Sequence, residues 1–122
     1  MKKLLILLFS ILISFNSYGE WKEYSIGGYV ETSSIKLHND YVYYWRMDDY
    51  GEPDKWGDMS SQAYSQGDCN LNRIKTLSYV FYKEGMGQGL SEQEDSVVKD
   101  WKYPAPGTFS SKALNYVCNY VN

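Results

Sequence analysis

The chain has 122 residues, a length that fits one domain with a modest hydrophobic core. Its formal net charge is −3, which argues against nucleic acid or anionic lipid as the partner, because both need lysine and arginine to neutralise phosphate. Tyrosine occurs 13 times, whereas histidine occurs once and cysteine twice, so few metal or catalytic sites can be built from this composition.

The N-terminal segment has the layout of a secretory signal peptide. Two lysines precede a predominantly apolar run of 12 residues, and small residues lead to a cut after Gly19. A buried N-terminal helix or strand is the alternative, but the segment has no amphipathic pattern. We therefore expect residues 1–19 to be removed, leaving one domain, residues 20–122, with a net charge of −5. No cysteine lies beside the cut, so no lipid anchor is expected after signal removal.

The first strand candidates form a hairpin. Residues 21–26 and 29–32 flank Gly27 and Gly28, and two glycines are a common hairpin connection. Residues 41–50 form the clearest strand, because large and smaller side chains alternate and aromatic residues are frequent.

The alternation in residues 41–50 also predicts which face of the strand is buried. The odd-numbered side chains are the more apolar set and are expected to point into the core: Tyr41, Tyr43, Trp45 and Met47. The even face, with Tyr44 and Arg46, is expected to be at least half exposed.

Two further strands and three connectors follow. Residues 60–66 are a weaker strand candidate, and residues 72–83 read as a central strand because their end is apolar on both faces. Glycine and proline mark the connectors, which are residues 50–58, 84–89 and 101–107. The glycine-rich segment 84–89 lacks the spacing of a phosphate-binding loop and is predicted to be a flexible turn.

The chain ends in a predicted amphipathic helix. Thr108 can cap its first turn, and apolar residues then recur at spacings of three and four. Cys118 lies on the apolar face of this helix. The residues therefore predict an α+β fold in which an antiparallel sheet carries one C-terminal helix on a face.

The two cysteines predict a covalent link between that helix and the sheet. Export permits a disulfide, and Cys69 with Cys118 is the one intramolecular pairing available. The chain-entropy model gives such a bridge about 4 kcal/mol. The alternative is a metal-binding or catalytic thiol, with His38 as the one histidine, and sequence spacing alone does not exclude a pair that meets in three dimensions.

Two groups of residues are candidates for a binding surface. Trp56 is an apolar ring in a polar loop, where it either contacts a partner or folds back onto the sheet. Tyr44, Arg46 and Tyr50 form a row of aromatic rings around a cation, a pattern found both in recognition surfaces and in self-packing. The carboxylates around the same loop do not follow a calcium-loop pattern and are expected to be solvated: Asp48, Asp49, Glu52, Asp54 and Asp58.

The order and spacing of these segments resemble the surface-adhesin protein E family of Gram-negative bacteria. The resemblance covers nearly all of the predicted mature chain, beginning with Trp21 and the stretch YVETSSIKLHNDYVYYWRMDDY. It continues through GDCNLNRIKTLSYVFYKEGMGQG and closes with PAPGTFSSKALNYVC. It implies a curved antiparallel sheet of about five or six strands, a C-terminal helix tied by the disulfide, and adhesion to host matrix proteins.

These observations predict an exported, non-catalytic binding module of the bacterial cell envelope, periplasmic or secreted, with a protein partner. No cofactor or metal is predicted, because no ligand spacing is present and the single histidine has no supporting triad. The main alternative is a small periplasmic accessory or inhibitor protein that has a protein partner and no adhesive role. A third possibility is an enzyme that uses the acidic loop.

Overall fold

The structure is a computed structural model that describes residues 20–122. The predicted signal peptide, residues 1–19, lies outside the described residues. The sheet and the C-terminal helix predicted from the sequence are both present. The elements, in chain order, are β1 Trp21–Ser25, β2 Gly28–Glu31, the 3₁₀ turn η1 Thr32–Ser34, β3 Lys36–His38, β4 Tyr41–Asp49, β5 Ser60–Asp68, β6 Arg73–Tyr82, the 3₁₀ turn η2 Gly85–Gly87, β7 Ser91–Gln93 and the helix α2 Phe109–Val121.

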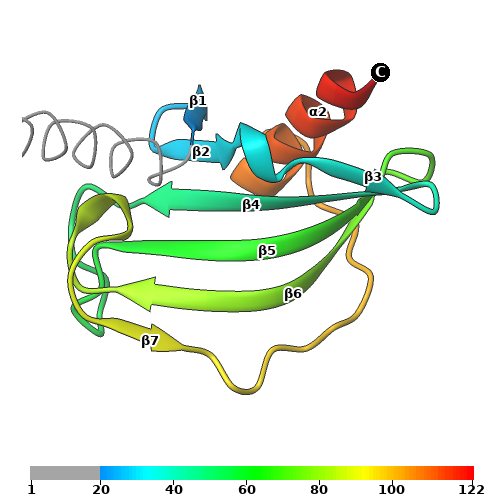
Figure 1. The fold of residues 1–122 in the computed structure, drawn as a ribbon. Helices are drawn as coiled ribbons and strands as arrows, with labels where there is room; N and C mark the ends of the chain where they lie inside the picture. The colour runs from blue at the N-terminus through cyan, green and yellow to red at the C-terminus, as the bar shows by residue number, and fades with distance from the viewer. Residues whose placement is uncertain (1–19) are drawn as a thin grey trace, which may run out of the picture.

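The strands form one open antiparallel sheet of seven strands in the order β1-β2-β4-β5-β6-β7 (Figure 1). The strand β3 pairs with the first half of β4, while β2 pairs with its second half, so β2 and β3 share one edge of β4. The hairpin of β1 and β2, the long β4 and the inner position of β6 confirm the strand predictions. The strands β3 and β7 were not predicted because each has three exposed residues and no apolar pattern.

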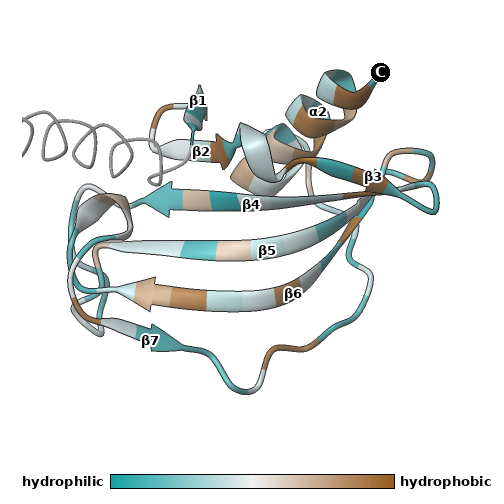
Figure 2. Ribbon diagram, in the orientation of Figure 1, coloured by the Kyte–Doolittle hydropathy of each residue, from teal (hydrophilic) through white to brown (hydrophobic). Residues whose placement is uncertain are grey.

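The helix α2 covers only part of one face of the sheet. Figure 1 shows it beside β1, β2 and β4, and it packs mainly against these strands. Thr108 caps the helix as predicted, because its Oγ1 accepts a hydrogen bond from the Ser111 N–H at 3.2 Å. Apolar residues recur along α2 (Figure 2), and the core is built from them and from the strands beneath: Val30, Val42, Tyr44, Ile74, Ala113, Leu114 and Val117.

The predicted direction of the faces of β4 is wrong with respect to the main core, although Met47 of the set predicted to point inward is buried at 1% exposure. The even-numbered side chains Val42 and Tyr44 are fully buried beneath α2, whereas Tyr43 and Trp45 lie on the opposite face and are half-buried. The reason lies in β5, where the positions beside this buried row are small: Ser61, Ala63, Ser65 and Gly67. The contact is closest at Gly67, where an added Cβ atom would lie 2.7 Å from Cδ1 of Leu114 in α2, so the small residues leave room for the helix on this face.

The disulfide is formed as predicted. Cys69, in the turn between β5 and β6, is bonded to Cys118 of α2, and their Cα atoms are 5.8 Å apart. Both residues pack against the edge of the hydrophobic core. The bond therefore ties the C-terminal helix to the end of the central hairpin.

Candidate partner-binding groove

The structure separates the predicted row of Tyr44, Arg46 and Tyr50. Tyr44 has no exposed surface and Arg46 is 9% exposed, so the expectation of an exposed recognition row is wrong for both. They are buried because they lie on the even face of β4, which faces α2. Tyr50 follows β4 and is half-buried, and its N–H donates to the Met59 carbonyl at 2.9 Å.

Arg46 is part of a buried polar cluster under the helix. Its Nη1 lies 3.7 Å from Oδ1 of Asp48, and the ring of Tyr44 is beside it on the same face of the strand. Burial raises the pKa of Tyr44 and of Tyr24 to about 12, so both phenols stay neutral. Burial also raises the pKa of Asp48, against the opposing effect of the Arg46 charge. The cluster is therefore a structural feature of the core.

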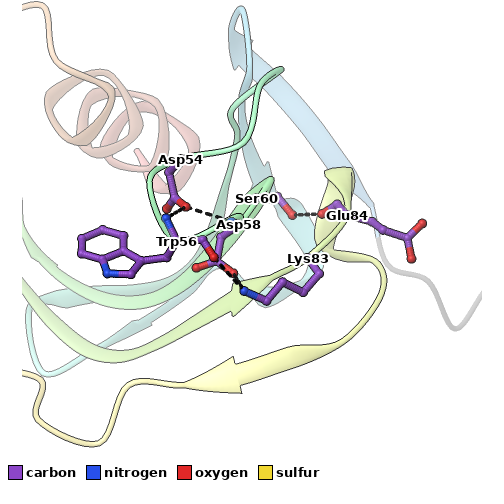
Figure 3. A network of polar contacts seen from close by, with 6 residues as sticks. All are labelled: Asp54, Trp56, Asp58, Ser60, Lys83 and Glu84. Carbon is purple, nitrogen blue, oxygen red and sulfur yellow. Dashed lines mark hydrogen bonds and ion pairs between the residues drawn. The ribbon is translucent and has the colours of Figure 1, made fainter.

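The ring of Trp56, which the sequence suggested as a contact residue, is accessible in the structure. The indole is 68% exposed and sits in the loop between β4 and β5. The carboxylate of Asp54 closes that loop: its Oδ1 accepts from the Trp56 N–H at 3.0 Å and from the Asp58 N–H at 2.8 Å. Figure 3 shows the indole projecting away from these polar contacts. The loop backbone is fixed while the ring remains free for contact.

A second set of contacts fastens the loop to the end of β6. The ammonium of Lys83 lies 2.9 Å from Oδ1 of Asp58 and donates to the Trp56 carbonyl at 3.1 Å (Figure 3). This ion pair holds the pKa of Lys83 above its usual value, so the cation stays charged. Beside it, the Ser60 hydroxyl donates to the Glu84 carbonyl at 2.7 Å. Trp56 is thus positioned by contacts on both sides of the loop.

A surface groove begins at Trp56 and runs over β6 and the segment after β7. Its first part has a volume of about 530 Å³ and is lined by Trp56, Asp58, Phe81, Lys83, Glu92, Gln93, Glu94 and Asp95. Its second part, of about 270 Å³, shares Phe81 and Glu94 with the first and adds Thr76, Tyr79, Val97, Val98, Asp100 and Lys102. We call the two parts together the Trp56 groove.

The Trp56 groove lies on the helix-bearing face of the sheet, beyond the reach of α2. Phe81 pairs with Ser61, and Ser61 pairs with Asp48, so all three side chains share the face that α2 covers near β4. One helix does not span the width of this sheet, and the part over β6 and β7 stays open (Figure 1). Phe81 of β6 pairs with Glu92 of β7, so an aromatic ring and a carboxylate lie side by side in the lining of the groove, and in Figure 2 the end of β6 is apolar while β7 is polar.

Sequence reasoning found Trp56 but missed the rest of the groove. Phe81 and Glu92 come together only through the pairing of β6 with β7, and β7 carries no strand signal. The acidic residues that were noted around residues 48–58 contribute Asp58 alone to the lining. The apolar pair at Val97 and Val98 was the one available signal, because it interrupts an otherwise polar segment.

The face opposite the helix is a second aromatic surface that the sequence assigned to the core. The rings of Trp45 and Tyr64 have centroids 5.1 Å apart, and those of Tyr43 and Tyr64 are 6.3 Å apart. Each of these rings is half-buried by its neighbours. These rings pack against one another, so the indole of Trp45 is less exposed than that of Trp56.

The described residues, 20–122, contain neither a cluster of metal ligands nor a membrane-spanning helix. No group of three or more histidine, cysteine or acidic side chains in that range converges as metal ligands would. In the same part of the chain, α2 is too short and too polar to cross a membrane.

Comparisons with known proteins agree with the fold. A family model described as surface-adhesin protein E matches residues 18–119. Crystal form II of Haemophilus influenzae protein E is similar with a TM-score of 0.64 and 22% identity, over 80% of this chain and 85% of that one. Protein E from non-typeable Haemophilus influenzae gives a TM-score of 0.60 at 20% identity, over 83% and 77% of the two chains. No curated protein matches the sequence.

Proposed function

Because the chain belongs to the surface-adhesin protein E family, we propose that it is an exported, non-catalytic adhesin of the bacterial cell envelope that binds a host matrix protein. The family assignment carries this proposal, and the Trp56 groove supports it from the geometry. Aromatic residues are enriched at protein interfaces, and tryptophan is among the residues that most often contribute large binding energies there. The groove is open to solvent and its loop is already fixed by Asp54 and Lys83, so binding requires little ordering.

The test is a binding assay with a panel of purified host matrix proteins and serum albumin as the negative control. The full chain is expressed in its own export-competent form, purified after processing, and applied to each immobilised protein. We expect saturable binding to at least one matrix protein and a loss of at least tenfold in affinity for Trp56→Ala. The matched control is Tyr120→Ala, because Tyr120 is also an exposed ring at 55% but lies on α2, away from the groove.

Two results would reject the proposal in this form. Binding to no matrix protein would remove the adhesive role, and co-purification with an envelope protein would then favour the accessory or inhibitor alternative. Equal losses for Trp56→Ala and Tyr120→Ala would show that the groove is not the contact surface. Cell fractionation and N-terminal sequencing of the mature chain measure export and cleavage after Gly19 directly.

A further inference from the structure

The Trp56 groove has a chemical character that restricts what can occupy it. Its lining contains two lysines, Lys83 and Lys102, and a larger set of carboxylates from Asp58, Glu92, Glu94, Asp95 and Asp100. Asp58 is neutralised by Lys83, so the excess negative charge comes from the carboxylates on and after β7. The Ser96 hydroxyl and N–H hold the pKa of Glu94 below its usual value, which keeps this carboxylate ionised.

The first part of the groove already binds cations of this chain. Lys83 places its ammonium between the carboxylate of Asp58 and the carbonyl of Trp56, at 2.9 and 3.1 Å. Lys55 places its ammonium 4.3 Å from the centroid of the Trp56 ring. The second contact joins two exposed side chains and is weak, so a better-held cation can displace it. An exposed indole beside carboxylates is therefore suited to a guanidinium or ammonium group.

The second part of the groove is suited to an apolar side chain. Phe81, Val97 and Val98 supply its apolar surface, and Val98 is 61% exposed. Phe81 and Glu94 belong to both parts, so the cation site and the apolar site are continuous. Their positions along the edge of the sheet fit consecutive side chains of an extended segment better than a bulky helix.

We propose that the Trp56 groove binds an extended basic segment of the partner protein. An arginine or lysine of that segment lies against Trp56 between the carboxylates, and a neighbouring apolar side chain contacts Phe81 and the two valines. This inference rests on the proposed function, because it names the chemistry of the partner at the same surface. A protein segment fits this surface because the lining combines carboxylates with an apolar half, and a free cation would leave the apolar half unused.

The experiment uses two peptides that differ only in charge. The probe is acetyl-Val-Arg-Val-Arg-Val-amide, and the control replaces each arginine by citrulline, which keeps the size and planarity of the side chain but is neutral. The ¹⁵N-labelled full chain, purified in its processed form, is titrated with each peptide and followed by NMR. We expect the arginine peptide to shift the indole N–H of Trp56 and to bind at least tenfold more tightly than the citrulline peptide.

Matched variants assign the contact to the groove. Trp56→Ala and the double variant Glu92→Gln, Glu94→Gln are each expected to weaken the arginine peptide at least tenfold. Glu52→Gln is the control, because Glu52 is an exposed carboxylate of the same loop that does not line the groove. Binding of the arginine peptide is also expected to weaken as salt is raised, since the carboxylates are exposed.

The outcomes separate this inference from the proposed function. Equal affinity of the two peptides, shifts confined to the Tyr43 and Tyr64 face, or no binding at all would overturn the basic-segment inference. If a matrix protein still binds with full affinity to the Glu92→Gln, Glu94→Gln variant, the adhesive function stands and only the inference is lost. If the arginine peptide binds in the groove but no matrix protein does, the inference stands and the adhesive function is lost.

Discussion

Cys118, near the end of α2, is bonded to Cys69 in the turn after β5, so residues 49 apart in sequence hold the helix against the central hairpin. We predict that Cys69→Ser, Cys118→Ser lowers the free energy of unfolding by about 4 kcal/mol, because the unfolded chain regains the entropy of the closed loop. For a domain of this size the melting midpoint should then fall by more than about 10 °C.

Thermal melts followed by circular dichroism measure this effect. The double variant avoids intermolecular disulfides through a leftover thiol. Addition of a reductant should lower the midpoint of the wild type and leave that of the variant unchanged. An identical midpoint for the two proteins under oxidising conditions would show that the bond contributes nothing to stability.

Gly67→Ala is predicted to destabilise the fold by about 1–3 kcal/mol through overpacking. A Cβ atom at this position would lie 2.7 Å from Cδ1 of Leu114 and 2.9 Å from Cγ1 of Val42. Both neighbours are fully buried core residues, so neither can move away freely. Urea denaturation measures the loss.

A double-mutant cycle gives the mechanism behind that loss. Leu114→Ala alone is expected to cost about 2–5 kcal/mol because it leaves a cavity. In the combined variant the alanine at 67 can occupy part of that space, so the two losses should sum to more than the measured total. Strict additivity would mean that Gly67 and Leu114 do not interact across the helix–sheet interface.

The Gly67 contact also shows what the sequence could and could not predict. Local patterns predicted β4, β6, the capped helix and the disulfide, because alternation, helical periodicity and a single cysteine pair each act over short range or admit one solution. The inward face of β4 was predicted wrongly, because the more apolar set of side chains was taken to be the buried set. The small residues on the neighbouring strand lie beside the buried row, and they become informative only when the pairing of Tyr44 with Ser65 is known.

Of the residues that line the Trp56 groove, only Trp56 could be predicted from the sequence, because the others come together through strand pairing. Trp56 stands out as an apolar ring in a polar loop, and that signal is local. Phe81, Glu92 and Val98 are brought together by the β6–β7 pairing and by the course of the chain after it. No periodicity within residues 91–100 indicates that arrangement.

The stability of the β5–β6 turn is predicted to depend on pH through Asp68. Burial alone would raise the pKa of Asp68, but hydrogen bonds from the N–H groups of Leu71 and Asn70 and from Arg73 outweigh it and hold the pKa below its usual value of 3.8. Because the pKa of Asp68 is lower in the folded state than in the unfolded state, the ionised carboxylate stabilises the fold. This stabilisation is complete above the unfolded-state pKa and is lost as the pH falls through the folded-state pKa.

The matched variant for this prediction is Asp68→Asn, which keeps an acceptor oxygen but has no charge. We expect the wild type to be the more stable protein at pH 6 and the difference in unfolding free energy to shrink as the pH falls below about 4. Urea denaturation at several pH values measures that difference. A difference that stays constant from pH 6 to pH 2 would exclude the Asp68 charge as its source.

Trp56→Ala is predicted to leave the free energy of unfolding within about 0.5 kcal/mol of the wild type, because the indole is 68% exposed. The comparison variant is Trp45→Ala. The ring of Trp45 is half-buried, and its centroid lies 5.1 Å from that of Tyr64. The second variant should be clearly less stable in the same urea titration. A large loss for Trp56→Ala would mean that the ring supports the fold and is not free for a partner.

Asp54 is predicted to be a positioning residue for Trp56. Its Oδ1 accepts the backbone N–H groups of Trp56 and Asp58, and its own N–H donates to the Asp58 carbonyl at 2.9 Å. Asp54→Ala removes the side-chain acceptor, so hydrogen exchange at the Trp56 and Asp58 amides should become faster while global stability falls by no more than about 1 kcal/mol. Affinity for the partner should fall as well, because the loop must then be ordered on binding.

Asp54→Asn retains the acceptor oxygen and should restore both the slow exchange and the affinity. Loss of affinity in Asp54→Asn with slow exchange preserved would instead mean that the Asp54 charge contacts the partner directly.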